Sequence, residues 1–365
     1  MRTLNTPLLL FMLTLALVTC GIVAVYSASA SSAYLTKQLL FAGIGLAAML
    51  FCYAIDYHVL KRASFWLMLV AFGLCCLVLV PGIGNEVKGA RRWLALGPIS
   101  IQPSELAKLA LIIYMAKMLS ERRAVIKSFF SGVFPALVVT GAFAAIIVIE
   151  PDFGAAFVLC LITFGMWLAA EMRWFHLVGL VLAAVPAALV AFLSEPYRAK
   201  RLIAFMFRDK ETLLGAGWQL HQSLIAIGSG GLWGLGLGES RQKFHYLSEA
   251  HTDFIFAIMA EELGFVAMSC IVGMFLLITV LGWKVAWRTT DLFGSLLATG
   301  VTLMVFIGAS INMCVVLGLL PTKGLVLPFI SAGGSSLIVC MAAMGILMNV
   351  AASLYHHQGA RAVTA

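Results

Sequence analysis

The sequence has few charged residues. Asp, Glu, Lys and Arg together make up 11% of its 365 residues, whereas a soluble globular domain contains about 25%. Hydrophobic residues reach 62%, and the mean hydropathy is +1.03. This composition excludes an ordinary soluble domain and predicts a chain that lies mostly within a membrane.

Three further absences exclude other classes of protein. The sequence lacks the short alternating segments of a transmembrane barrel, because its apolar runs are long and continuous. None of the eight cysteines lies outside these runs or has metal-ligand spacing, so we interpret them as small buried residues rather than disulfides. The glycines of 231–240 lack the strand and helix that a dinucleotide site requires.

The apolar runs predict an all-α polytopic membrane protein. Each of ten segments has about the 20 residues that a bilayer-spanning helix needs. They are 7–27, 38–55, 64–81, 105–119, 129–149, 153–170, 174–193, 254–282, 292–317 and 335–354. The first run is longer than the apolar part of a signal peptide, so we keep it as a helix. We expect one domain over 1–365, with a large extracytoplasmic loop over about 194–252.

The basic residues predict the orientation. Eleven of the 24 fall in short loops or termini on one side of the predicted membrane, which places both termini in the cytoplasm. The other 13 lie on the outer side, concentrated in 82–104 and 194–252. They could form a solvated loop surface. Their concentration in two loops favours the alternative, an anionic substrate at the outer leaflet.

Asp253 is the central candidate for chemistry. It follows a glycine-rich polar stretch and opens the eighth predicted span, and an acid at a membrane edge is costly enough to suggest a function. The alternative is a helix N-cap, because Asp caps helices well. Helical spacing lets Glu261 look into the same cavity as Asp253, whereas Glu262 is expected to face nearly the opposite way.

Other polar residues interrupt the apolar pattern near the same side. Glu105 and Lys108 have i, i+3 spacing, which predicts an ion pair acting as a strut for a substrate cavity. Asp152 follows a tight turn and is expected to cap the sixth span. The segment 318–336 breaks the last two spans with prolines and glycines, which suits irregular backbone lining a cavity.

At these residues the chain resembles the SEDS family of bacterial cell-wall proteins. The matching stretches are 89–108 (GARRWLALGPISIQPSELAK), 150–154 (EPDFG), 217–264 (with QSLIAIGSGG, SRQK and EAHTDFIFAIMAEELG) and 320–336. The segment 321–324 and the Ser335-Ser336 ending are typical of the division branch. Ala332 and Ser248 depart from the tyrosine and proline usual at these positions.

The resemblance implies a ten-helix peptidoglycan glycosyltransferase acting at the outer face of the cytoplasmic membrane, at the division septum. Its implied substrate is lipid II, a disaccharide-pentapeptide on undecaprenyl pyrophosphate. The implied partners are a class B penicillin-binding protein, which is the transpeptidase, and other membrane proteins of the division machinery. No nucleic acid is expected. The family's essential aspartate falls on Asp253, and a divalent cation (Mg or Mn) is associated with its activity.

The residues themselves fit this chemistry. An inverting displacement needs one base for the acceptor hydroxyl and a good leaving group, and Asp253 is placed to be the base. Basic residues would hold the leaving pyrophosphate. The expected substrate-binding residues are Arg91, Arg92, Arg198, Lys200, Arg201, Gln219, Arg241, Lys243, His251, Lys323 and Ser335. We assign no metal ligands.

Alternatives stay open on sequence alone. A transporter flipping lipid II predicts charges near the bilayer midplane and discontinuous helices paired across two repeated halves. A scaffold that only recruits the transpeptidase, or an elongation or sporulation paralogue, would fit the same spans. We expect the partner's single span to dock on the eighth and ninth spans, with Gly273 and Gly294 as the small contact residues.

Overall fold

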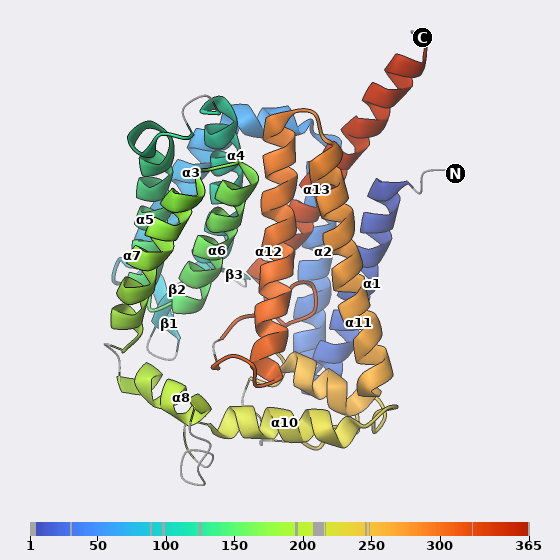
Figure 1. Cartoon of the computed structure of the whole chain (residues 1–365). Helices are drawn as coiled ribbons and strands as arrows, with labels where there is room; N and C mark the ends of the chain where they lie inside the picture. Colours follow the sequence, from blue (N-terminus) through green and yellow to red (C-terminus); the bar gives the residue numbers. More distant parts are fainter. Residues whose placement is uncertain are drawn as a thin grey trace.

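The computed structural model describes residues 5–363 except 30, 88–89, 97–98, 124–125, 194–195, 207–214, 216, 245–246, 248 and 323. Its long helices form a bundle in which both chain termini lie at one end (Figure 1). The helices are α1 Thr6–Ser29, α2 Ser32–Ala54, α3 Tyr57–Val78, α4 Pro103–Glu121, α5 Phe134–Ile149, α6 Phe153–Ala169, α7 Trp174–Leu193, α11 Ile255–Arg288, α12 Leu292–Val316 and α13 Gly334–Val363. A short π-helix, Phe129–Val133, leads into α5.

These ten helices coincide with the ten predicted spans, so the predicted fold class is confirmed. Seven spans among the described residues are long and apolar enough to cross a membrane. The apolar helix α6 and the first part of α7 are shorter, and α4 carries the Glu105–Lys108 pair. The chain is therefore a multi-pass membrane protein.

The centre of the bundle is formed by α4, α12 and α13. Helix α12 contacts α11, α4, α6 and α13, and α13 also lies along α2 and α1. Three helices begin at an aspartate whose side chain accepts a hydrogen bond from a backbone N–H group in the first turn. Asp56 caps α3, Asp152 caps α6 and Asp291 caps α12, and each cap is worth about 0.5–2 kcal/mol.

A small antiparallel sheet joins α3 to α4. Its strands are β1 Gly84–Val87, β2 Ala90–Leu96 and β3 Ile99–Ile101, in the order β1-β2-β3. Strand β2 contacts α3 and α4, and β3 contacts α13. The sheet therefore covers the end of the bundle where α4 begins, and the sequence did not predict it.

Two helices occupy the long loop before α11. Helix α8 spans Pro196–Met206 and α10 spans Trp218–Gly230. Both lie across the end of the bundle opposite the termini (Figure 1). Helix α10 packs on α11, and the Ser223 hydroxyl donates to the Val316 carbonyl at 2.8 Å. Part of the expected loop is thus helical.

Helix α11 is broken at Gly264, which has φ 76° and ψ 178°. This backbone conformation favours glycine. The 231–238 loop fills the break, with its backbone so close that a side chain at Gly264 would overlap it. Four backbone bonds of 2.9–3.2 Å join the two: Phe265 N to Gly231 O, Val266 N to Leu232 O, Leu235 N to Glu261 O and Gly236 N to Glu262 O. The backbone N–H and C=O groups that lose their helical partners at the break therefore form hydrogen bonds with the loop instead.

Candidate active site

Asp253 lies in a tight turn, 249–254, that leads into α11. The helix begins at Ile255, and Phe254 occupies its N-cap position without a side-chain cap bond. The N-cap position thus falls on Phe254, one residue after Asp253. Glu249 in this turn has φ 62°, a left-handed conformation that costs a non-glycine residue about 1–3 kcal/mol and is concentrated at functional sites.

The turn is held against the 318–333 loop. Four hydrogen bonds connect them. Asn312 Nδ2 on α12 bridges the two by donating to Asp253 O (3.0 Å) and to Leu325 O (2.6 Å). Ser331 Oγ donates to Thr252 O (2.7 Å), and Ala332 N donates to His251 O (3.0 Å). The Asp253 carboxylate lies against Gly324, where an added Cβ would be 2.9 Å from Oδ2. The backbone of Asp253 is thus fixed from two directions, while its carboxylate faces the loop.

Polar and aromatic groups from other elements border this turn. The Tyr34 ring on α2 lies 4.5 Å from the His251 ring. Arg201 on α8 contacts the Thr322 carbonyl at 3.4 Å and Gln219 Oε1 at 3.3 Å. A guanidinium is therefore positioned beside the same loop that carries Gly324, as a phosphate-binding residue would need.

A second polar cluster lies around the start of α4. Lys108 Nζ donates to Glu105 Oε1 at 2.7 Å, with both side chains at most 10% exposed. Gln102 Nε2 donates to Asp152 Oδ2 at 2.9 Å. The Ser335 hydroxyl ties this cluster to α13, because it accepts from Gln102 N at 2.9 Å and donates to Ser100 O at 3.1 Å.

Glu150 is the most enclosed acid of this cluster, with no exposed surface. Its carboxyl oxygens have no nitrogen or oxygen partner among the described residues. Arg92 instead donates to the carbonyls of Glu150 (3.2 Å) and Pro151 (2.5 Å). Burial, the largest cause, and the neighbouring Asp152 together raise the pKa of Glu150 to about 8 against the opposing charge of Arg92.

The two clusters flank the 318–333 loop on opposite sides. A Cβ at Gly154, near the start of α6, would meet Leu325 at 3.0 Å and Gly324 O at 3.6 Å. Gly324 in turn abuts Asp253. Asp253 and Gly154, at the start of α6, thus both border the same stretch of irregular backbone.

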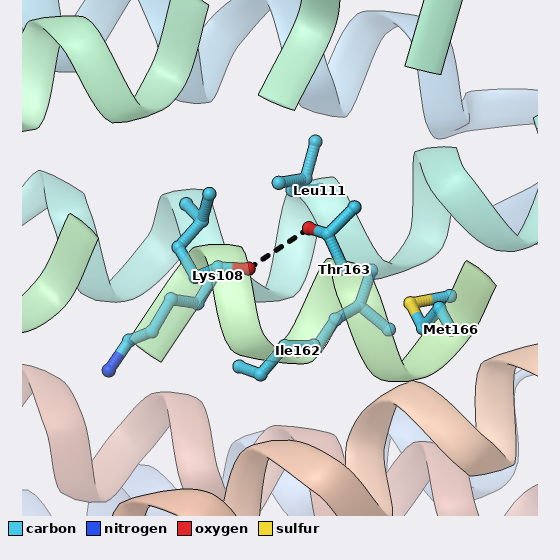
Figure 2. Close-up of a pocket in the computed structure, with 7 residues that line it drawn as sticks. Lys108, Leu111, Ile162, Thr163 and Met166 are labelled. Atoms are coloured by element: carbon cyan, nitrogen blue, oxygen red, sulfur yellow. Dashed lines mark hydrogen bonds between the residues drawn. The ribbon is translucent and has the colours of Figure 1, made fainter. Parts of the chain in front are cut away.

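A small gap lies beside Lys108, between α4 and α6, and it is too narrow to admit a water molecule. Figure 2 shows the Lys108 ammonium pointing away from Thr163, whose hydroxyl donates to Leu159 O at 2.9 Å. The remaining lining is apolar. This space suits side-chain packing better than a charged substrate.

Glu261 and Glu262 hold one common segment, 240–243. Glu261 accepts from Ser240 Oγ (2.5 Å), and Glu262 accepts from Lys243 Nζ (3.2 Å). Glu262 also accepts from Ser27 Oγ on α1 at 2.6 Å. The expectation placed Glu261 on the same side as Asp253 and Glu262 nearly opposite Asp253, and did not foresee that both glutamates bind one segment. It assumed an isolated helix, but a neighbouring segment wraps around the end of this one.

The other residues predicted to bind the substrate differ in whether they are exposed or already paired with protein groups. Arg91 pairs with Glu86 at 3.3 Å. Lys200 and Arg241 are exposed, and Arg241 N donates to Glu261. Lys323 lies outside the described residues, as does the side chain of Arg198. Gly294 is packed against Tyr57, whereas Gly273 has open space around it, so of the two docking residues only Gly273 is available to a partner.

The described residues contain no group of three His, Cys, Asp or Glu side chains that could hold a metal ion. Glu261 and Glu262 are already occupied by the 240–243 segment. The described residues therefore do not fit a divalent-cation site made by protein groups alone.

Sequence reasoning missed Asn312, Ser331 and Gln102. Asn312 had a usable signal, because a lone amide within an apolar span is costly and needs partners. Ser331 and Gln102 had none, since each lies in irregular backbone whose neighbours are distant in sequence.

Comparisons with known proteins place this chain in a family. The family model of the FtsW, RodA and SpoVE proteins, described as "Cell cycle protein", matches residues 7–356. A "Probable peptidoglycan glycosyltransferase FtsW" from Trichlorobacter lovleyi is 42% identical, covering 97% of this chain and 95% of the relative. "Stage V sporulation protein E" of Bacillus subtilis is 44% identical, covering 95% of this chain and 97% of the relative.

Solved structures share the fold. One chain, from a structure titled "Structural coordination of polymerization and crosslinking by a peptidoglycan synthase complex", has a TM-score of 0.80 and 28% identity, covering 95% of this chain and 97% of its own. The rod shape determining protein RodA of Thermus thermophilus has a TM-score of 0.72 and 29% identity, covering 95% of this chain and 96% of its own.

Proposed function

We infer from the FtsW, RodA and SpoVE family, to which this chain belongs, that the protein is a peptidoglycan glycosyltransferase. It polymerises lipid II into glycan strands for the septal wall in cell division. The relatives named peptidoglycan glycosyltransferase FtsW support this activity and role. The observation that carries the assignment is the Asp253 carboxylate, which faces Gly324 of the 318–333 loop just before α11.

In the mechanism we propose, Asp253 is the general base. It accepts the proton of the acceptor hydroxyl as that oxygen attacks the anomeric carbon of the lipid-linked donor, and the bond to pyrophosphate breaks. Asn312 positions the base by holding both the Asp253 and the Leu325 carbonyls. General base catalysis contributes about 10²–10⁴-fold.

Basic side chains would stabilise the leaving pyrophosphate. Arg201 is the best-placed described candidate, because it reaches Thr322 next to the Asp253 loop. Arg198, Lys200 and Lys323 remain predictions. Lys243 pairs with Glu262, and Arg92 donates to the Pro151 carbonyl. We therefore assign these two residues a role in holding the structure together rather than in binding the substrate. A divalent cation, if used, would have to bind largely through substrate phosphate oxygens, as Mg²⁺ often does.

The protein works, we propose, with a class B penicillin-binding protein whose single span docks against α11. An open glycine, Gly273, allows the close approach that membrane helices use in packing.

Orientation is proposed from the basic residues: both termini in the cytoplasm, and α8 and α10 outside. A cysteine at exposed Lys200 should react with an impermeant thiol reagent in intact spheroplasts. Reaction only after lysis would reverse the orientation.

Polymerisation of labelled lipid II by the purified protein, with and without the transpeptidase, tests the function. Glycan product is expected in the presence of the partner. In vesicles loaded with lipid II on one side, transmembrane movement without glycan would favour a flippase instead. That alternative has one supporting feature, the discontinuous helix α11, but the acids and bases of the site gather at one end of the bundle rather than at its middle.

A further inference from the structure

The 231–238 loop exposes apolar side chains in a stretch expected to be a polar loop. Trp233 is 80% exposed, and Leu232, Leu235 and Leu237 are also exposed. The sequence contains no charged residue from 222 to 238. Such a cluster of exposed apolar side chains is typical of a surface that contacts a membrane or another protein.

The position of the loop is fixed by the break in α11. Its backbone bonds to Phe265 and Val266, the first residues after Gly264. The part of α11 from 265 to 288 is 24 residues long, about 36 Å at 1.5 Å per residue, which is enough to cross a bilayer. If residues 265–288 form the membrane-spanning part, the loop at its start would lie where the hydrocarbon meets the headgroups.

The apolar surface of the loop continues onto a lipid-facing helix. Phe265 and Val266 are exposed immediately beside it, as expected for a span that faces acyl chains. Trp is favoured at this depth because its ring is apolar and its N–H can bond to water or headgroups.

We propose that the 231–238 loop is a membrane-interface anchor, inserting Leu232, Trp233, Leu235 and Leu237 into the leaflet on the side of α8 and α10. The anchor has a second consequence, which rests on the proposed function. The segment 240–243 follows directly and is held by Glu261 and Glu262, so the anchor sets the height of the active-site end of α11 relative to the headgroups of a lipid-linked substrate.

Fluorescence of the protein in nanodiscs tests the location without any activity assay. The chain has eight tryptophans, so Trp233 is isolated by subtracting the emission of Trp233→Phe from that of the parent. The two quenchers are phosphatidylcholine brominated on its acyl chains and acrylamide in water. Trp66, exposed in the middle of α3, provides the lipid-facing reference through Trp66→Phe.

We expect the Trp233 signal to be quenched by brominated lipid to an extent comparable with Trp66, and only weakly by acrylamide. Quenching by acrylamide without quenching by brominated lipid would place the loop in water and overturn the proposal. Quenching by neither would mean that protein covers Trp233, which also overturns it. Should Trp233→Phe fail to fold, Trp233→Tyr gives the same subtraction. If the parent protein forms no glycan while Trp233 shows the expected lipid quenching, the anchor stands and the proposed function alone is contradicted.

Discussion

Lys243 and Glu262 form an ion pair that is almost entirely enclosed. Their charged atoms are 3.2 Å apart, and the side chains are 5% and 2% exposed. Lys243 also donates to the carbonyls of Ser27 and Gly238. The pair thus connects α1, the broken helix α11 and the segment that precedes the active-site turn.

We expect Lys243→Met to destabilise the protein by about 3–5 kcal/mol, because Glu262 is left buried and unpaired. The double variant Lys243→Met/Glu262→Gln should recover most of that loss. Thermal unfolding in detergent measures both. A double variant no more stable than the single one would contradict the pairing, and a stable double variant without polymerase activity would return Lys243 to the substrate-binding residues.

The break in α11 predicts that alanine substitution destabilises the protein much more at Gly264 than at Gly273 of the same helix. Gly264→Ala places a Cβ within 2.3–2.6 Å of the 231–238 backbone at φ 76°, so we expect a loss of more than about 1–3 kcal/mol. Gly273→Ala, where the added Cβ meets nothing within 4 Å, is the matched control. Equal unfolding temperatures for the two variants would argue against the inserted loop.

Glu150 makes stability depend on pH. Its folded pKa of about 8 exceeds the ordinary 4.5, so the folded state binds more protons between these values and stability falls as pH rises through that window. Asp152, whose pKa burial also raises, acts in the same direction, and Arg92 opposes both.

Glu150→Gln cannot ionise, so its unfolding temperature should fall less between pH 5 and 8 than that of the parent. The advantage of the variant should be largest near pH 8. Parallel pH profiles for the two proteins would show that Glu150 is not held neutral.

Docking of the partner is predicted at the open face of α11. Gly273→Leu should weaken co-purification with the transpeptidase and activation by it, because bulk prevents close helix packing. Gly73→Leu, at an equally open glycine of α3, is the control and should have no effect. Identical effects of the two substitutions would place the docking surface elsewhere.

Much of the fold could be predicted from the sequence, because each membrane-spanning helix is determined by the apolar residues of its own segment. Long apolar runs predicted all ten helices, and Asp152 signalled the start of α6. The i, i+3 spacing of Glu105 and Lys108 likewise predicted their contact. In each case the deciding interactions lie within one element.

The site was only partly predictable because it is assembled from distant segments. Asp253 could be selected as a costly charge at a membrane edge, but its fixation by Asn312 and Ser331 depends on tertiary packing. The contacts of Glu261 and Glu262 with 240–243 were not predicted, because helical periodicity alone says nothing about a loop that inserts at Gly264. Helix α10 was missed because its glycine-rich continuation looked like irregular structure.

The central claim is that the Asp253 carboxylate accepts a proton during glycosyl transfer. Asp253→Asn keeps the size of the side chain but cannot serve as the base. We therefore expect a folded variant that still binds its transpeptidase, with polymerisation reduced by at least about 10²-fold.

The most direct measurement is the initial rate of glycan formation from labelled lipid II by purified Asp253→Asn in complex with its partner. The account predicts almost no polymer, with an unfolding temperature and co-purification equal to those of the parent. Polymerisation at more than a small fraction of the parent rate would contradict it, because Asp253 would then not be the base.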